Sequence, residues 1–504
     1  MKPTNPIRAI AYLLCFTFSV TLFSQDLIPP ALKDGFNQVT SCDELSSFIH
    51  LLDDHSDLLN VEVIGQSVKG RNLYALMYSS SRFGKDQSKI RVLIFAQQHG
   101  NEQSGKEGAL LLAAELLKPE NRYLFDRMDL ALIPQVNPDG SELNQRRNGN
   151  NMDLNRNHLI VTEPETRALH ALFDRYLFEV TLDVHEYYPY GGEWEKYGYR
   201  KNFDITVGAV TNPNISERIR GFSNDDYLPY IFHYLNERNF SSFVYCPGGP
   251  PEIAYIRHST FDINDGRQWP GIQNTFSFIQ EGMNGEDSNL ANLHHRAEGQ
   301  MAGMRGMLEF AYVHSDKIKD LVASERGKLL KGTAGQLVSI QSEHVSDGRQ
   351  LVISLYSYHS KTDTTVTVVD YRPVVRSIHD VSRPYGYLIP KGSDELVGWA
   401  RRQSLKIVSL KAKGSFLTEQ YFITAIDSID FEGDIIINPQ VSGMETSGVT
   451  TPGNYYFIPA NQLKGNLIVL ALEPRSMLGL ATYEKYAHLM QSGKNYPVLR
   501  VIKK

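Results

Sequence analysis

A histidine and a glutamate three residues apart, His99 and Glu102, are the side chains of this sequence best suited to metal chemistry. They follow residues 91–97, an apolar run with the composition of a buried strand. Side chains just past the end of a strand can turn toward one point, and an imidazole and a carboxylate there suit zinc. Two ligands do not make a site, so the rest of the chain must supply a third ligand, a base and an anion clamp.

Two later strand ends offer the third ligand and the base. His185 ends the apolar run 181–185, and two histidines with one glutamate leave a fourth position on zinc for water, as in catalytic sites. Glu281 ends a further apolar run and is a candidate general base for the metal-bound water. Each of these residues alone is common in solvated loops, so only their combination indicates a site.

A segment rich in arginine and asparagine, residues 146–157, lies between the ligand candidates. Adjacent Asn155 and Arg156 can bind a carboxylate together, the arginine through a bidentate fork. An arginine of the pair at 146 and 147, if near zinc, can stabilise an oxyanion. Asp153 can accept the second ring N–H of a zinc-bound histidine and so fix its tautomer.

The elements that would position these residues alternate between strands and helices from about residue 34 to 314. The patterns predict strands at 61–64, 73–78, 91–97, 130–136, 180–184 and 276–279, and helices at 40–59, 107–117, 163–178 and 293–312. This alternation favours an α/β fold: a mixed, largely parallel sheet with helices on both faces. Sites in such sheets form beyond the carboxyl ends of the strands.

After about residue 315 the pattern becomes typical of antiparallel strands, at 337–345, 351–358 and 364–370. A small α/β passage follows, with a strand at 386–390, a helix at 394–403 and a strand at 405–410, and the last part is strand-like, including 467–472. We therefore predict a catalytic domain over 34–315 and a β-rich C-terminal accessory region over 316–504. No linker separates them, so the second half is expected to dock on the first.

The beginning of the chain predicts export. Lys2 and Arg8 precede an apolar run, residues 10–23, and a small residue, which is typical of a secretory signal peptide over 1–24. The run is short of the about 20 residues of a membrane span, although a membrane anchor is the alternative. We expect a secreted or periplasmic protein, in which a disulfide between Cys42 and Cys246 is permitted. With a net charge of −6 and no long basic run, nucleic acid is not an expected partner.

The ordered set of motifs resembles the carboxypeptidase A-like family of zinc carboxypeptidases, peptidase M14, over roughly residues 41–312. The motifs are His99-x-x-Glu102, Asn137-Pro138-Asp139-Gly140, Arg146-Arg147-Asn148, Asp153-Leu154-Asn155-Arg156-Asn157, His185 and Ser277-Phe278-Ile279-Gln280-Glu281. Gly65-Gln66-Ser67 with Gly70-Arg71 resembles the opening segment of the family.

The resemblance implies a metallocarboxypeptidase that hydrolyses the C-terminal peptide bond of peptides through a zinc-activated water. It implies one zinc ion held by His99, Glu102 and His185, with Glu281 as general base and proton donor, Arg146 on the scissile carbonyl, and Asn155 and Arg156 on the substrate's free terminal carboxylate. An amidase or cell-wall peptide hydrolase on the same scaffold, and a non-catalytic protein that binds peptides or glycans, are the alternatives.

The substrate pocket is where the sequence departs from the family pattern. Members often carry a tyrosine that caps the substrate, and Tyr245 and Tyr255 are both candidates here. Asp262 and Asp265 could favour a basic terminal residue, but acids of this kind also form turns. The preferred terminal residue therefore stays open at the level of sequence.

Overall fold

The computed structural model describes residues 27–286, 288–332, 334–410, 416–431, 434–449 and 452–503. The predicted signal peptide, residues 1–24, lies outside these ranges. Within them, none of the helices has both the length and the apolar character that crossing a bilayer requires.

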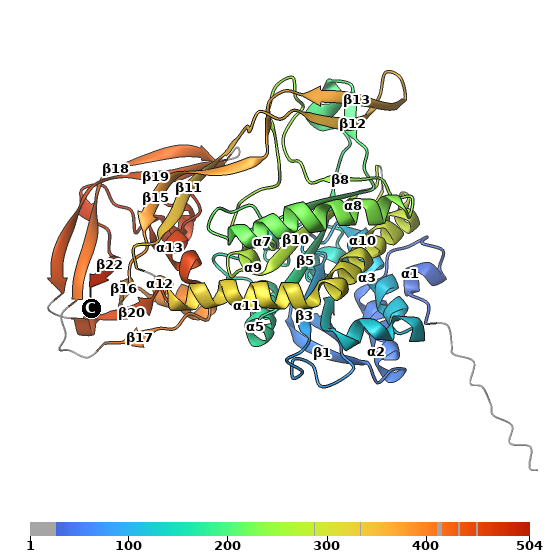
Figure 1. The fold of residues 1–504 in the computed structure, drawn as a ribbon, viewed down its shortest axis with the longest axis horizontal. Helices are drawn as coiled ribbons and strands as arrows, with labels where there is room; N and C mark the ends of the chain where they lie inside the picture. The colour runs from blue at the N-terminus through green and yellow to red at the C-terminus, as the bar shows by residue number, and fades with distance from the viewer. Residues whose placement is uncertain are drawn as a thin grey trace, which may run out of the picture.

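An eight-stranded mixed sheet forms the centre of the first half of the chain (Figure 1). Its strands lie in the order β1 (Leu59–Gln66), β2 (Asn72–Tyr78), β4 (Met128–Ile133), β3 (Ile90–Ala96), β5 (Val180–Tyr187), β10 (Phe276–Met283), β7 (Ile205–Ala209) and β8 (Ser242–Val244). The central strands β4, β3, β5 and β10 run parallel to one another. The pairs β1–β2, β2–β4 and β10–β7 are antiparallel. The predicted α/β class with a largely parallel core is confirmed.

Both faces of this sheet are covered by helices, which explains why its central strands are apolar throughout. Along β3, Val92 and Ile94 belong to the core on one face, while Leu93 and Phe95 belong to the core on the other. The first face packs against α2 (Cys42–Asp54), α3 (Gln103–Leu116), α8 (Leu228–Asn236) and α10 (Leu293–Val313), and the second against α5 (Pro164–Tyr176) and α9 (Gln268–Gly271).

Shorter elements connect these layers. The helices are α1 (Pro30–Lys33), α4 (Pro138–Glu142), α6 (Gly192–Lys196) and α7 (Glu217–Phe222).

Helix α2 begins with a capping box in which the Ser41 side chain accepts from the Glu44 backbone N–H, and the Glu44 side chain accepts from the Ser41 backbone N–H. This reciprocal cap fixes the start of α2 two residues later than the sequence pattern predicted.

The second half of the chain is joined to the first through strands. β12 (Leu351–Ser357) lies between β13 (Thr362–Val368) and β6 (Tyr199–Lys201), and β14 (Tyr371–Arg372) pairs with β9 (Ile256–Arg257). A long helix, α11 (Ser315–Lys331), follows α10 and runs toward the C-terminal sheets (Figure 1). One cluster of buried apolar side chains continues from α2 to the C-terminal elements, so the expected docking of the second half is present.

The C-terminal elements form two further sheets. β11 (Leu337–Val345) pairs with β15 (Val374–Ser382), and a seven-stranded sheet contains β16 (Gly386–Pro390), β17 (Val408–Ser409), β18 (Phe416–Phe431), β19 (Asp434–Val449), β20 (Tyr455–Pro459), β21 (Lys494–Asn495) and β22 (Leu499–Lys503). Helices α12 (Asp394–Arg402), α13 (Gly465–Leu472) and α14 (Glu484–Ala487) accompany them. The predicted β-rich character of this region is confirmed.

Two predictions in this half are wrong. Residues 467–472, predicted as strand-like, belong to the helix α13, and every residue of that helix is buried. An apolar run that is buried on all sides does not reveal its period, so periodicity cannot separate a buried strand from a buried helix. The strand predicted at 405–410 is reduced to β17, and α11 was not predicted at all.

Candidate metal centre

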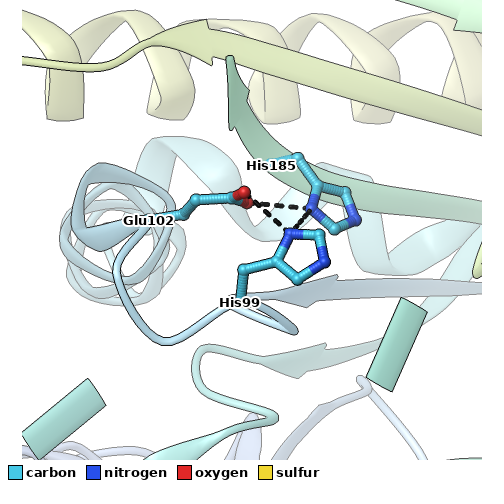
Figure 2. Close-up of side chains that lie close together, drawn as sticks. All are labelled: His99, Glu102 and His185. Carbon is cyan, nitrogen blue, oxygen red and sulfur yellow. Dashed lines mark hydrogen bonds and ion pairs between the residues drawn. The ribbon is translucent and has the colours of Figure 1, made fainter. Parts of the chain in front are cut away.

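His99, Glu102 and His185 lie together in a buried cluster just after the end of β3 and near the carboxyl end of β5 (Figure 2). Their candidate ligand atoms all lie within 4.8 Å of one another. The Nδ1 atom of His99 is 2.7 Å from Glu102 Oε1, and the Nδ1 atom of His185 is 2.9 Å from Glu102 Oε2. The two Nδ1 atoms are 3.2 Å apart, so both rings turn the same nitrogen toward one point.

Each histidine is held from behind by a second carboxylate. His99 Nε2 is 3.1 Å from Asp153 Oδ1, which is the contact between Asp153 and a ligand histidine that the sequence predicted. His185 Nε2 is 2.9 Å from Asp183 Oδ1, and Asp183 is completely buried. A carboxylate on the far nitrogen fixes the tautomer, so that Nδ1 carries the lone pair needed by a metal.

The electrostatics of the cluster favour positive charge. Burial opposes a charge on Glu102, yet the two histidines lower the pKa of this carboxyl well below its usual range. Burial likewise opposes a charge on His185, yet Asp183 and Glu102 raise its pKa well above the ordinary value. A cluster of two histidines and a glutamate that stabilises positive charge at one buried point has the donor set and the charge for a zinc ion.

The loop that carries His99 is shaped by its backbone. Gln97 adopts a φ of 59°, which turns the chain out of β3. A Cβ on Gly100 would lie 2.1 Å from the backbone carbon of Gly140, so no larger residue fits this close approach. The Asn137 side chain donates to the carbonyl oxygens of Gln98 and Arg146 at 3.1 and 3.2 Å. The Asn-Pro-Asp-Gly turn thus holds the loops of two predicted site residues together.

The opening segment is tied to the same turn. The buried carboxylate of Asp139 accepts hydrogen bonds from Ser67 Oγ at 2.9 Å, from the Lys69 backbone N–H at 2.9 Å and from Arg71 Nη1 at 2.7 Å. Three residues of the opening segment are therefore tied through one carboxylate to the turn that holds the His99 loop.

Arg146 lies beside the cluster, as the sequence predicted for an oxyanion-binding arginine. Its Nε donates to Asp153 Oδ2 at 3.1 Å, and its Nη1 is 3.6 Å from Glu102 Oε1. About half of the side chain remains exposed, at 47%. The guanidinium is therefore oriented by Asp153 while part of it remains available to a ligand.

Asn155 and Arg156, the predicted carboxylate clamp, lie on the other side of Asp153. Asn155 Oδ1 accepts from the Gly266 backbone N–H at 2.7 Å, and its Nδ2 lies 3.3 Å from His185 Nε2. Burial disfavours the charged form of Arg156, but nearby Asp262 and Asp153 outweigh this effect and raise the pKa of its guanidinium above the ordinary value. Asn155 is thus fixed to the loop around Gly266 and to the metal cluster, and Arg156 Nη1 donates to the Asn155 carbonyl oxygen at 3.0 Å.

Glu281 is the register partner of His185 across the parallel β5–β10 pair. It is 8% exposed, and burial is the main cause that raises its pKa above the ordinary value for a glutamate. A carboxylate with a raised pKa is better able to accept a proton near neutral pH.

One cavity of about 340 Å³ is lined by predicted residues from all of these groups. They are His99, Glu102, Arg146, Asn155, Arg156 and Glu281. The third metal-ligand candidate, His185, adjoins it through the contacts described above. The structure therefore brings together the candidate metal ligands, the candidate base, Arg146 and the predicted carboxylate clamp.

The candidates for the substrate pocket separate. Tyr245 lines the cavity, whereas the ring of Tyr255 lies against Arg372, whose guanidinium carbon is 4.0 Å from the ring centroid. Asp265 also lines the cavity, but its Oδ2 is paired with Arg267 Nη2 at 2.7 Å and its Oδ1 accepts from the Gln268 backbone N–H at 2.5 Å. Asp265 is therefore already compensated, and Arg267 stands beside it in the cavity wall.

Three residues of the site were not found from the sequence. Asp183 supports His185, Gln98 Nε2 donates to both oxygens of Asp183 at 3.0 and 2.9 Å, and Arg267 lines the cavity. The signal for Asp183 was a carboxylate inside an otherwise apolar strand, because such a group must find a partner when buried. The two cysteines whose pairing the sequence left open, Cys42 and Cys246, are both free.

Comparison with known proteins agrees with this geometry. Residues 45–202 match the zinc carboxypeptidase family, peptidase M14. Carboxypeptidase 2 of Trichophyton rubrum is 24% identical over 511 residues, which cover 95% of this chain and 89% of that protein. Human carboxypeptidase D is 25% identical over 241 residues, covering 42% of this chain and 18% of that protein.

Solved structures of carboxypeptidases also align with part of the chain. A metallo-carboxypeptidase from Burkholderia cenocepacia aligns with a TM-score of 0.42 at 18% identity, over 55% of this chain and 69% of that one. Carboxypeptidase A from Helicoverpa armigera aligns with a TM-score of 0.42 at 17% identity, over 57% and 74%.

The family match covers His99, Glu102 and His185 together with the arginine- and asparagine-rich segment, while Glu281 lies beyond it. The relatives from Trichophyton extend the similarity over nearly the whole chain. The chain is a metallopeptidase whose residues 45–202 match the zinc carboxypeptidases of peptidase M14.

Proposed function

We propose that the protein is a zinc-dependent exopeptidase that removes the last residue of a peptide bearing a free C-terminal carboxylate. The observation that carries the proposal is the shared cavity, which is lined by two of the candidate metal ligands, the buried carboxylate of Glu281 and three arginines. An arginine close to the metal restricts the substrates to peptides with a free C-terminus, because it binds the terminal carboxylate.

Zinc, when held by His99, Glu102 and His185, would supply a Lewis acid that polarises the scissile carbonyl and lowers the pKa of water. The protein's own groups do the rest of the chemistry. Glu281 accepts a proton from the attacking water and delivers it to the departing amine. Arg146 donates to the carbonyl oxygen as negative charge develops there, and its bond to Asp153 keeps it oriented.

Asn155 and Arg156 bind the terminal carboxylate and so set which peptide bond reaches the metal. Asn155 is held in place for this role, because its Oδ1 accepts from the Gly266 backbone N–H and its Nδ2 lies 3.3 Å from His185 Nε2. Positioning of this kind contributes on the order of 7–11 kcal/mol in favourable cases.

The test combines metal analysis with a panel of N-terminally blocked peptides that differ only in the last residue. We expect about one zinc per chain, hydrolysis that a chelator abolishes, and release of single C-terminal residues. Glu281→Gln should retain zinc and lose turnover by roughly 100- to 10,000-fold. Unchanged turnover in that variant would refute its role as the base, and a zinc-free, inactive wild-type protein would favour a binding protein instead.

A further inference from the structure

A second cavity, of about 390 Å³, adjoins the metal cavity. The two cavities share the side chains of Tyr187, Tyr188 and Tyr245. The other walls of the second cavity are largely aromatic or apolar and include Tyr190, Trp194, Phe203, Val244 and Ile353. An aromatic chamber therefore lies directly beside the metal cavity.

Lys201 supplies a positive charge in this chamber. Its Nζ donates to the carbonyl oxygen of Cys246 and lies 5.3 Å from the centroid of the Trp194 ring. An ammonium group has three donors, so this contact leaves two of them for another acceptor. Lys201 is partly buried, and within the described residues no carboxylate forms an ion pair with it.

The surroundings of Lys201 strengthen its attraction to a negatively charged partner. Burial lowers the pKa of Lys201, with Arg257 acting in the same direction and Cys246 and Glu281 opposing it. Glu193, the acidic residue in the wall, is paired with Lys196 at 2.5 Å. Aromatic walls exclude water, and an ion pair is stronger where water is excluded.

The second half of the chain builds part of this chamber. Lys201 ends β6, where it is the register partner of Leu355 in β12, and Ile353 of the same strand lines the cavity. The Tyr187 hydroxyl donates to the Phe203 carbonyl oxygen at 2.5 Å and accepts from the Phe203 backbone N–H at 3.0 Å. These contacts hold the chamber in shape independently of any ligand.

We propose that this chamber is a substrate subsite that binds an acidic side chain of the peptide, with the carboxylate of an aspartate or glutamate on Lys201. The inference rests on the proposed function, because it takes the peptide in the metal cavity as the source of the side chain. The aromatic walls of the chamber pack against the methylene groups of the acidic side chain, and the Lys201 ammonium group binds the carboxylate of that side chain.

The test uses N-terminally blocked peptides that carry either glutamate or glutamine at each of the last three positions in turn. At one of these positions we expect the zinc-loaded enzyme to favour glutamate over glutamine in kcat/KM by roughly five- to thirtyfold. In Lys201→Met the preference should disappear, while the glutamine peptide is hydrolysed at a similar rate. Lys201→Arg should keep a preference for glutamate.

Lys85→Met is the matched control, because it removes one positive charge at an exposed lysine that lines neither cavity. It should retain the preference of the wild type. No preference at any position in an active wild-type enzyme would overturn the subsite, as would an equal loss on both peptides in Lys201→Met. Absence of hydrolysis on every peptide would instead refute the proposed function.

Discussion

The substitution Asp183→Asn tests whether the second carboxylate behind His185 tunes metal binding. Asparagine has nearly the same shape as aspartate, so the apolar strand around it need not repack. In the native site His185 Nδ1 faces Glu102, which leaves Nε2–H to donate to Asp183 Oδ1 at 2.9 Å. The substitution changes the charge behind His185 and leaves the three candidate ligands in place.

The size of the effect follows from the hydrogen bonds around residue 183. Gln98 Nε2 is 3.0 and 2.9 Å from the two Asp183 oxygens, and Gln98 Oε1 is held 2.8 Å from His158 Nε2. An amide offers one oxygen, so its own NH₂ group must face one of the two donors. Replacing a charge-assisted bond by a neutral one costs about 1–2 kcal/mol. That difference weakens zinc binding roughly five- to thirtyfold.

The assay is competition for zinc against a chromophoric chelator at fixed pH, with thermal unfolding recorded in parallel. Asp316→Asn is the control, because it makes the same charge change at a side chain that is 85% exposed. We expect the control to bind zinc as the wild type does. A folded Asp183→Asn protein with wild-type zinc affinity would refute the argument that this carboxylate supports the metal ligand.

Three further outcomes test the clamp, the buried histidines and the C-terminal contacts. In Arg156→Gln, the preference for a peptide acid over the matching peptide amide should fall roughly 10- to 100-fold in kcat/KM, and an unchanged preference would exclude Arg156 from the clamp. Burial lowers the pKa of His258 to about 4, so the unfolded chain binds the extra proton between pH 6.5 and 4 and stability is lost as the pH falls through this window. Urea unfolding of His258→Gln should show a pH slope there that is shallower by about 1.4 kcal/mol per pH unit, and equal slopes would contradict this. Gln403→Leu leaves the His158 carbonyl without its amide donor and should lower the free energy of unfolding by about 1–3 kcal/mol, measured against the wild type by urea unfolding.

The central sheet could be predicted because its physics is local. Strands buried on both faces are apolar along their whole length, and β3, β5 and β10 all carry this signal. Parallel strands place their carboxyl ends at one edge, so residues after β3 and near the end of β5 were expected to meet. The strand ends themselves were less accurate, because β5 runs on to Tyr187 and therefore contains His185.

The partners behind the ligands could not be predicted with the same reasoning. Asp183 meets Gln98 only because β3 and β5 are neighbours in the sheet, and sequence order does not give that order of strands. A Cβ on Gly266 would lie 2.3 Å from Asp183 Oδ2, so the loop after β9 must also approach this carboxylate closely. Contacts of this kind depend on three segments that are far apart in the chain.

Sequence patterns did not predict a role for the C-terminal half. Among the parts that the structure describes, it carries no cluster of metal-ligating residues, so its motifs indicate no function. Its hydrogen bonds to the first half of the chain indicate a supporting role. Trp399 Nε1 donates to the Leu159 carbonyl oxygen at 2.9 Å, and Arg402 Nε donates to that of Ile160 at 3.1 Å.

These acceptors belong to two consecutive residues that lie shortly after the predicted clamp residue Arg156 in the chain. Gln403 Nε2 completes the row by donating to the carbonyl oxygen of His158 at 2.9 Å, and the Tyr483 hydroxyl donates to that of Arg156 at 3.4 Å. Backbone carbonyls that are buried in an interface cost free energy when their donors are removed. A chain that ended near residue 315 would lose all of these donors at once, and the segment that positions Arg156 would lose its support. We therefore expect residues 316–504 to be needed for recognition of the terminal carboxylate, although the candidate metal ligands lie in the first half of the chain.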